Sequence, residues 1–435
     1  MKVLIFGGGG REHALAWAIA KSPRVTEIVC APGNGGIADL ARLVPVSLSD
    51  VDAMVRVALA EQPDLTVVGP ELPLSLGLVD ALQQRGLKVF GPTRAAAMLE
   101  CSKSFAKRFL QRHQIPTANY AVCKTLAEVE KAVEFFHAPI VVKADGLAAG
   151  KGVVICQSRR AALETAQGLF SGELLGAKSG FGEQLLVIEE FLVGDEVSFL
   201  CLTDGVHVTP LVPAQDHKRI GEGDTGPNTG GMGVYSTDSI LEPQMQEWIL
   251  HHIAQPTIRG MAEEETPFAG VLYIGLMMTA RGPQVLEFNA RFGDPETQAI
   301  LLRLDSDAGS DLVEALEACA DGRLSEIKLR WKPGASACVI AASGGYPEGF
   351  QMGLVITGVE DAEAIPGVQV FHSGTARMGG VLRTGGGRVL GVSAAAATLK
   401  EALNDVYRAM GKIHFEGMYF RRDIGHRALS KRDSQ

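Results

Sequence analysis

Three polar side chains near residue 290 have the spacing of a binding site on a β-strand. Side chains alternate along a strand, so Glu287, Asn289 and Arg291 share one face. The other face carries the apolar side chains that we expect in a core, Leu286, Phe288 and Ala290. Carboxylate and amide oxygens suit a hard cation such as Mg²⁺, and Arg291 can bind a carboxylate or a phosphate with its planar fork. A half-buried strand with a polar outer face is the alternative reading.

A lysine ends another apolar run immediately before a glycine-containing loop. Lys143 closes the run, and the loop continues to Lys151 and Gly152. A buried ammonium group must be paired or must bind an anion, so this segment can bind and cover a triphosphate. It differs from a Walker loop because no hydroxyl residue follows Lys151. A flexible hairpin with a solvated lysine is the alternative.

A run of glycines at residues 7–10 follows the first apolar strand and opens a helix. Backbone N–H groups and a helix N-terminus can hold a phosphate there. A dinucleotide fingerprint needs a third glycine where this chain has Glu12 and His13, and an acidic residue where it has the segment 31–34. A monophosphate therefore fits better than NAD, and a tight turn without a ligand stays open.

Two further segments carry polar groups with less specific spacing. The strand expected at 185–190 ends in two glutamates before an apolar turn, where a planar base can lie, although acidic residues at a strand end are more often solvated. Residues 214–236 show hardly any periodicity, many glycines and the charged group at 216–219. They predict either a loop that approaches a ligand closely or a disordered surface loop.

The elements that position these residues follow from the apolar runs. Strands expected at 3–6, 28–30, 65–68 and 89–90, separated by helices, predict a parallel sheet covered on both faces in a Rossmann-like domain. Helices are expected at 95–113 and 243–262. Further strands are expected at 139–144, 152–156, 185–190, 198–202, 270–278 and 284–290. After a boundary at 331–334 come strands at 335–342, 368–372 and 388–394 and a helix at 398–412, which predict a small α+β domain.

Composition limits the classes of function. The 435 residues include 51 glycines, are 46% hydrophobic and 21% charged, and carry a net charge of −9, which favours folded domains and gives no basic stripe for nucleic acid. Seven scattered cysteines without a CxxC pair and ten histidines without ligand spacing argue against zinc or thiol catalysis. We expect buried free thiols in a cytoplasmic protein, since no signal peptide or membrane span is evident.

Five motifs resemble signatures of the glycinamide ribonucleotide synthetases (phosphoribosylamine-glycine ligases), a family of ATP-grasp enzymes of purine biosynthesis. They are Gly9–His13, Lys143–Val153, Gln215–Arg219, Asp224–Gly233 and Phe292–Gln298. The last three are specific to the family, whereas the lysine loop alone indicates only an ATP-grasp protein. The resemblance covers essentially the whole chain.

The resemblance implies an α/β and α+β multidomain fold and one reaction. A Rossmann-like domain would span 1–100, an ATP-grasp domain 101–330 with an inserted lid at about 122–192, and a small α+β domain 331–435. ATP would lie between lid and core. The implied activity is the ligation of glycine to 5-phosphoribosylamine through glycyl phosphate, giving glycinamide ribonucleotide, ADP and phosphate. A monomer or weak homo-oligomer without nucleic-acid or membrane partners is expected.

The same resemblance implies roles for individual residues. ATP would be bound by Lys103, Lys143, Lys151, Glu189, Glu190, Phe191, Leu192 and Glu196. The divalent cation, Mg²⁺ or Mn²⁺, would be held by Glu287 and Asn289. The substrates would be bound by Gly8, Gly9, Gly10, Asp216, Lys218, Thr225, Asn228, Gly230 and Arg291. The catalytic residues would be Arg291 and Lys143.

Two departures from the family pattern bear on these roles. The family usually has Asn or Ser where this chain has Gly8, so a side-chain bond to phosphate is expected to be absent. The segment 273–278 also supplies no acidic metal ligand, so we predict a metal shell completed mainly by ATP oxygens and water. The alternatives are another ATP-grasp carboxylate-amine ligase, a non-catalytic nucleotide-binding protein and, less favoured, a nicotinamide-dependent dehydrogenase.

Overall fold

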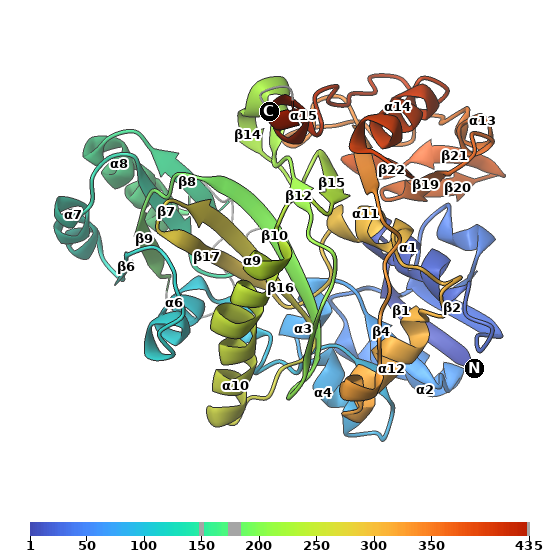
Figure 1. Ribbon diagram of the computed structural model, residues 1–435, viewed down its shortest axis with the longest axis horizontal. Helices are drawn as coiled ribbons and strands as arrows, with labels where there is room; N and C mark the ends of the chain where they lie inside the picture. Colours follow the sequence, from blue (N-terminus) through green and yellow to red (C-terminus); the bar gives the residue numbers. More distant parts are fainter. Residues whose placement is uncertain (148–151, 173–183, 433–435) are drawn as a thin grey trace.

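The N-terminal part of the chain forms the parallel sheet that the apolar runs predict. The computed structural model describes residues 1–147, 152–172 and 184–432 (Figure 1). The sheet has the order β3-β2-β1-β4-β5, and its pairs are parallel. Its strands are β1 (Lys2–Gly7), β2 (Glu27–Pro32), β3 (Arg42–Leu43), β4 (Leu65–Val68) and β5 (Val89–Phe90). Its helices are α1 (Gly10–Ile19), α2 (Val51–Glu61), α3 (Glu71–Ser75) and α4 (Leu78–Gln83). The strand order reverses between β1 and β4, so the glycine run after β1 lies at a topological switch point, where such sheets bind ligands.

The single helix expected over 95–113 is two helices, so that expectation is wrong in detail. α5 (Met98–Cys101) ends at Ser102 and α6 (Lys103–Arg112) begins after it. Ser102 has extended backbone angles, and its hydroxyl accepts from the N–H of Phe105 at 3.1 Å. A serine that caps a helix in this way competes with continuation of the preceding one.

A small antiparallel sheet forms a separate lobe, at the left of Figure 1. Its order is β6-β9-β7-β8, and α7 (Leu126–Phe135) and α8 (Arg159–Ser171) pack on it. The strands are β6 (Tyr120–Cys123), β7 (Ile140–Ala144), β8 (Val153–Cys156) and β9 (Leu186–Glu190). The lobe has its own apolar cluster, which includes Val129, Ala162 and Ile188. A lobe with its own core can move as a unit.

The central sheet places the polar strand found in the sequence. Its antiparallel order is β11-β10-β16-β17, from β11 (Val208–Pro210), β10 (Asp195–Asp204), β16 (Ala269–Thr279) and β17 (Gly282–Asn289). Gly275 pairs with Glu287 whereas Leu276 pairs with Val285, so Leu286 is an extra residue in a β-bulge. Leu286 is only half-buried as a result, and the expectation that it lies in the core is wrong.

The helix expected over 243–262 is interrupted by a π-helical turn, Leu250–Ala254, which separates α9 (Pro243–Ile249) from α10 (Gln255–Glu263). α10 packs beside the central sheet through buried Ile258 and Met261. Within the described ranges, no helix combines the length and the apolar character that a membrane crossing requires. All seven cysteines are free and buried, as expected.

The C-terminal sheet combines strands from two distant parts of the chain. Its order is β12-β15-β18-β22-β19. These strands are β12 (Gln215–Asp216), β15 (Gly233–Thr237), β18 (Ala335–Ala342), β22 (Arg388–Ala396) and β19 (Val368–His372). Two hairpins accompany it, β13 (Arg219–Gly221) with β14 (Thr225–Asn228) and β20 (Thr375–Met378) with β21 (Val381–Thr384). The helices from residue 296 onward are α11 (Glu296–Leu302), α12 (Leu312–Asp321), α13 (Val359–Glu363), α14 (Leu399–Met410) and α15 (His426–Arg432).

The segment 214–236 is therefore not without regular structure, which corrects the interpretation of it as a plain loop. It contains β12 to β15, and these strands are two to five residues long. Strands this short carry too few side chains for an alternating pattern to be recognised. β15 is fully buried because it pairs with β18, about a hundred residues later in the chain.

Candidate active site

The lobe formed by β6 to β9 and the central sheet meet at a cluster of charged side chains. Glu189 on β9 is buried, with Oε1 3.0 Å from Lys143 Nζ and Oε2 3.1 Å from Lys107 Nζ on α6. Lys143 also donates to the carbonyl oxygen of the bulged Leu286 at 3.1 Å. Lys107 donates to Thr117 Oγ1 at 2.7 Å. One carboxylate and two lysines thus fasten β7 and β9 to the core.

Lys103 lies close to these groups at the start of α6. Its Nζ donates to the carbonyl oxygen of Gly146 at 2.8 Å, directly after β7. Burial lowers the pKa of Lys103, Glu287 raises it and Lys143 lowers it again. Asp145 fixes the same corner, because it accepts from the backbone N–H of Ser104 at 3.2 Å and from its hydroxyl at 2.7 Å. Lys103 therefore lies near both Lys143 and Glu287.

Glu287 lies among three lysines. Lys218 Nζ forms an ion pair with Glu196 and lies 3.5 Å from Glu287 Oε1. Burial acts to raise the pKa of Glu287, but Lys218, Lys143 and Lys103 lower it to about 2. Glu287 is therefore ionised at neutral pH. Burial acts to lower the pKa of Lys218, but Glu196 and Glu287 raise it well above its usual range.

Arg291 fixes the end of the strand that carries Glu287. Its guanidinium donates to Asn289 Oδ1 at 3.2 Å and lies 3.0 Å from Glu100 Oε1 and 3.3 Å from Glu71 Oε2. Glu100 also accepts from a backbone N–H at 2.8 Å, so both partners of the ion pair are further anchored. The amide oxygen of Asn289 is thereby oriented on the same strand as Glu287.

The glycine run begins α1 and meets polar groups from the C-terminal half of the chain. Gly9 is the N-cap, and its N–H donates to Glu12 Oε2 at 2.6 Å. A Cβ at Gly10 would lie 2.5 Å from both Ser373 Oγ and Gln298 Nε2, so the close approach requires glycine. Ser373 Oγ and Gln298 Oε1 are buried without a hydrogen-bond partner in the described part of the chain. These two oxygens are available to a ligand at the glycine run.

Gly8 is packed against the loop that follows β2. A Cβ there would lie 2.4 Å from the carbonyl oxygen of Gly33. Asn34 Nδ2 donates to the carbonyl oxygens of Gly8 at 3.0 Å and His372 at 2.7 Å. Gly8 has no side chain that could form a hydrogen bond, and the side chain of Asn34 forms one to this loop instead.

Asp216 offers a further unfilled acceptor. Its Oδ1 is buried without a partner among the described residues. Burial and the nearby Glu296 raise the pKa of Asp216 well above its usual range, although Lys218 lowers it. Glu296 is itself satisfied, because it accepts from Tyr273 at 2.8 Å and Ser198 at 3.1 Å. A cationic group bound beside Asp216 would lower this pKa and favour the ionised carboxylate.

The remaining predicted residues lie on the margins of this cluster. Glu190 accepts from the N–H of Asn119 at 2.9 Å and lies 2.9 Å from Arg281, so it is paired on the outer side of β9. After it the exposed Phe191 and the buried Leu192 lead into β10. Lys151 lies outside the described residues.

Thr225, Asn228 and Gly230 follow in the β13–β14 hairpin and its exit. The hydroxyl of Thr225 donates to the carbonyl oxygen of Glu222 at 2.9 Å, within the hairpin itself. Gly230 N–H donates to Tyr346 at 3.2 Å, from the C-terminal part of the chain. The contacts of Thr225 and Gly230 are therefore made within the hairpin and to the C-terminal sheet region.

Sequence reasoning missed Arg388 and Lys107. Arg388 donates to the carbonyl oxygens of Gly230 and of Asp294, the latter at 2.8 Å, and Asp294 Oδ2 accepts from the N–H of Arg11 at 3.4 Å. It thus joins the hairpin region to the glycine run. The available signal was a lone arginine after three glycines in a segment left without a role. Nothing in the sequence distinguishes Lys107, because a lysine at this position of α6 is common in amphipathic helices.

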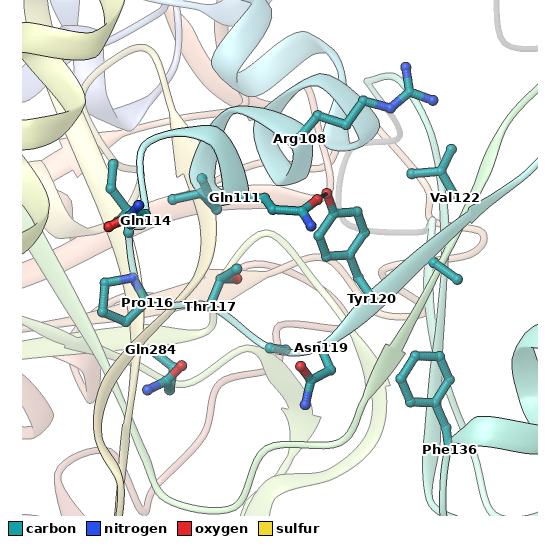
Figure 2. Close-up of a pocket in the computed structure, with 14 residues that line it drawn as sticks. Arg108, Gln111, Gln114, Pro116, Thr117, Asn119, Tyr120, Val122, Phe136 and Gln284 are labelled. Atoms are coloured by element: carbon teal, nitrogen blue, oxygen red, sulfur yellow. Dashed lines mark hydrogen bonds between the residues drawn. The ribbon is translucent and has the colours of Figure 1, made fainter.

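A pocket of about 700 Å³ lies beside the segment that links α6 to β6 (Figure 2). Amide side chains of Gln111, Gln114 and Asn119 line it together with Tyr120, whose hydroxyl donates to Gln111 at 2.6 Å. Thr117 belongs both to its lining and to the hydrogen bond with Lys107. The pocket lacks the convergent lysines and carboxylates of the cluster, so we place the candidate active site at the cluster.

Three family models match successive parts of the chain. The N domain of phosphoribosylglycinamide synthetase matches residues 1–100, its ATP-grasp (A) domain residues 101–297 and its C domain residues 336–427. The chain belongs to the phosphoribosylglycinamide synthetase family. This assignment confirms the resemblance seen in the motifs and the ATP-grasp fold.

Full-length relatives of the phosphoribosylglycinamide synthetase family agree with the domain matches. Curated phosphoribosylamine-glycine ligases of Brucella melitensis and Chlorobaculum tepidum are 46% and 47% identical, and each alignment covers 99% of this chain and at least 99% of the relative. The crystal structure of the Thermotoga maritima phosphoribosylamine-glycine ligase superposes with a TM-score of 0.83 at 34% identity, over 98% of this chain and all of that one. A biotin carboxylase complex with β,γ-ATP from Campylobacter jejuni has a TM-score of 0.72 at 14% identity, over 97% of this chain and 93% of that one, and shows the shared fold alone.

Proposed function

We propose that this chain ligates glycine to 5-phosphoribosylamine with ATP, forming glycinamide ribonucleotide, ADP and phosphate in purine biosynthesis. The observation that carries the proposal is the convergence of Lys103, Lys143 and Lys218 on Glu287 at the edge of the lid-like lobe, in a chain that matches all three domains of the family. Cations around an ionised carboxylate suit a nucleotide triphosphate and its divalent cation. We retain the division into 1–100, 101–330 with a lid at about 122–192, and 331–435 as part of this proposal.

Lys103 and Lys143 bind the ATP phosphates in this proposal, and Glu189 orients Lys143 through their ion pair. Lys151 joins them from the lid loop. The adenine lies beside Glu190, Phe191 and Leu192. Glu196 accepts from the ribose, and its present partner Lys218 is then released toward the reacting groups. Phosphate charge then replaces the charge of Glu196 beside Lys218, so the positive charge of this lysine stays balanced.

Glu287 and Asn289 fit a divalent cation. Glu287 is an ionised carboxylate, and the amide oxygen of Asn289 is oriented by Arg291, so together they offer two oxygen ligands on one strand. The described residues contain no group of three or more His, Cys, Asp or Glu side chains that could hold a metal ion. Two protein ligands suit Mg²⁺ or Mn²⁺ that also binds ATP oxygens and water. When bound, the cation offsets charge on the phosphoryl oxygens.

The reaction then needs positioning and charge stabilisation. An oxygen of the glycine carboxylate attacks the γ-phosphorus in line, the bond to the bridging oxygen of ADP breaks, and glycyl phosphate forms. Lys143 stabilises the phosphoryl oxygens, and Arg291 acts beside them as a fixed cation. The amine of 5-phosphoribosylamine next attacks the glycyl carbonyl, phosphate leaves and the amine loses a proton. No protein nucleophile is needed.

The two acceptor substrates occupy the unfilled polar groups. The ammonium group of glycine pairs with Asp216, whose Oδ1 has no partner in the described residues, near Lys218, Thr225, Asn228 and Gly230. The phosphoribosyl group lies at Gly8, Gly9 and Gly10, where Ser373 Oγ and Gln298 Oε1 are available. Both substrates thereby reach the space between the glycine run and Glu287. We propose a cytoplasmic monomer or weak homo-oligomer that binds neither nucleic acid nor membranes.

One assay separates this function from its alternatives. ADP release is measured with ATP, glycine and freshly generated 5-phosphoribosylamine, and each is omitted in turn. The proposal requires that ADP release depend on glycine and that glycinamide ribonucleotide accumulate in equal amount. Equal release without glycine overturns it. Dependence on a different carboxylate would indicate another ATP-grasp ligase, and nucleotide binding without turnover would indicate a nucleotide-binding protein.

A further inference from the structure

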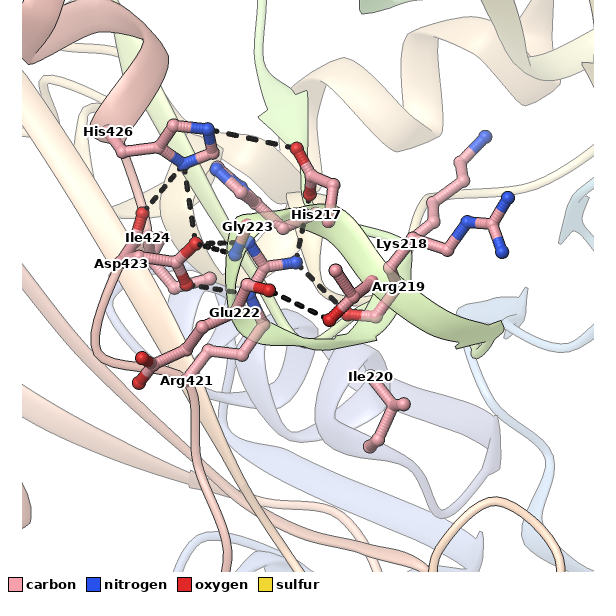
Figure 3. Close-up of polar contacts among 12 residues, drawn as sticks. His217, Lys218, Arg219, Ile220, Glu222, Gly223, Arg421, Asp423, Ile424 and His426 are labelled. Carbon is pink, nitrogen blue, oxygen red and sulfur yellow. Dashed lines mark hydrogen bonds and ion pairs between the residues drawn. The ribbon is translucent and has the colours of Figure 1, made fainter.

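A short C-terminal segment holds the β13–β14 hairpin. We define the C-terminal clasp as residues 419–427, which follow β22 and α14 in the sequence and include the start of α15 (Figures 1 and 3). Tyr419 donates to the carbonyl oxygen of Ile220 at 2.9 Å, and the N–H of Gly223 donates to Asp423 at 2.8 Å. About 200 residues of sequence separate the two sides of these contacts. The hairpin is therefore fixed from outside its own domain sequence.

Arg421 is the centre of the clasp. Its side chain is fully buried, although the guanidinium is charged. It makes a bidentate contact with Asp423, at 2.8 and 2.7 Å, and donates from Nη1 to Asp224 at 2.9 Å. Arg427 also pairs with Asp224. Burial acts to raise the pKa of Asp224, but Arg427 and Arg421 lower it to about 2, so the network stays ionised at neutral pH.

The clasp contacts both chain neighbours of Lys218. Arg421 Nη1 donates to the carbonyl oxygen of Arg219 at 3.0 Å. On the other side, the N–H of Gly425 donates to Nε2 of His217 at 3.3 Å. Burial lowers the pKa of His217 to about 3, so its ring is neutral and Nε2 can accept. Figure 3 shows the Lys218 side chain extending away from this network.

The far end of Lys218 reaches the ATP and metal residues. Its Nζ pairs with Glu196 and lies 3.5 Å from Glu287 Oε1. The carbonyl oxygen of Lys218 accepts from the N–H of Thr229 at 2.7 Å and from its hydroxyl at 2.9 Å. The clasp holds the residues on either side of Lys218. It therefore fixes the position of the Lys218 backbone, and hence which carboxylate the side chain can reach.

We propose that Arg421 is a positioning residue that sets Lys218 for the reaction by fixing the β13–β14 hairpin against the C-terminal clasp. The inference rests on the proposed function, because it takes Lys218 to act on the bound substrates. It adds a specific requirement: the buried guanidinium acts through Lys218 rather than through the general stability of the domain. A displacement of a reacting group by about 1 Å can lower a rate about 100-fold.

A double-mutant cycle on the full chain tests this proposal. Arg421→Lys keeps the charge but cannot make all four contacts of the guanidinium. We expect it to lower kcat for glycine-dependent ADP release about 10- to 100-fold and to change KM for ATP less than about threefold. In a Lys218→Ala background it should cause no further loss, because the residue through which it acts is gone. Losses that multiply, or a Lys218→Ala chain with wild-type kcat, would overturn the proposal.

A second variant and a control keep the outcome clear. If Arg421→Lys fails to fold, Arg427→Gln replaces it in the same cycle, since Arg427 is partly exposed and reaches Arg421 through Asp224. Arg408→Ala is the matched control, because within the described part of the chain this exposed arginine of α14 forms an ion pair only with Asp405, at 2.8 Å. Its kcat should stay at the wild-type value. ADP release by the unsubstituted chain that ignores glycine would overturn the proposed function, whereas glycine dependence with multiplying losses would overturn the clasp alone.

Discussion

Lys107, the buried lysine that pairs with Glu189, should give the stability of the protein a measurable dependence on pH. Lys107 is 3% exposed, and burial lowers its pKa from 10.5 to about 8 although Glu189 raises it. The unfolded chain therefore holds this proton at pH values where the folded chain has lost it. Since the unfolded state binds more protons between about pH 8 and 10.5, this group makes stability rise with pH across that window.

The magnitude follows from the two pKa values. Between about pH 7.5 and 9.5 the folded lysine loses most of its charge and the unfolded lysine little, so the free energy of unfolding should rise by about 2 kcal/mol from this group. Lys107→Met removes the titrating group while Lys143 still pairs with Glu189. The variant should therefore lack that rise.

Urea unfolding of wild type and variant at the two pH values measures this difference. NMR of ¹³Cε-labelled lysines gives a direct second readout. Burial lowers the pKa of Lys21 to about 8 as well, so the Lys107 resonance is the one near pH 8 that is absent from Lys107→Met. Lys400→Met, at an exposed position of α14, is the control and should keep the wild-type pH dependence. An equal rise in wild type and Lys107→Met, or a Lys107 resonance that titrates above about pH 9, would refute the burial argument.

Three further predictions concern the substrates and the cation. Glu287→Ala should lower kcat at least about 100-fold and raise the Mg²⁺ concentration needed for half-maximal rate, and an unchanged Mg²⁺ dependence would remove Glu287 from the metal site. Gly10→Ala should raise KM for 5-phosphoribosylamine about tenfold with little effect on ATP binding by calorimetry, because its Cβ would lie 2.5 Å from Ser373 Oγ. Asp216→Asn should raise KM for glycine more than KM for ATP, and the opposite order would refute pairing of Asp216 with the glycine ammonium group.

Much of the fold could be predicted because apolar runs bounded by turn residues indicate buried strands. The strands at 65–68, 335–342 and 368–372 occur at the predicted residues. Breaks in regular elements were harder, because Ser102 ends one helix and caps the next without changing the apolar pattern. The bulge at Leu286 was also hidden, since one extra residue becomes visible only when the partner strand is aligned.

The candidate site was predictable where chemistry and spacing coincide in one segment. Glu287, Asn289 and Arg291 are such a case, and the structure brings them together with Lys143 and Lys103. Contacts between distant segments were not predictable, as with Arg388, whose partners lie 94 and 158 residues earlier. Close contacts require glycine at two places in the C-terminal region: a Cβ at Gly387 would lie 2.3 Å from the Tyr346 ring, and one at Gly374 would lie 2.6 Å from Gly386 Cα.

The pairing of β15 with β18 has a consequence for how this chain can be divided. β15 comes before residue 240 and β18 after residue 334, yet they are neighbours in one sheet. A truncation before β18 would leave the buried β15 with a free edge, which invites pairing with other chains. The C-terminal region is therefore not a detachable cassette for gene fusion or domain exchange. A cut in the exposed turn 348–352 would keep β15 with β18 in one fragment and β19 with β22 in the other, and the β18–β22 pairing would have to form between the fragments.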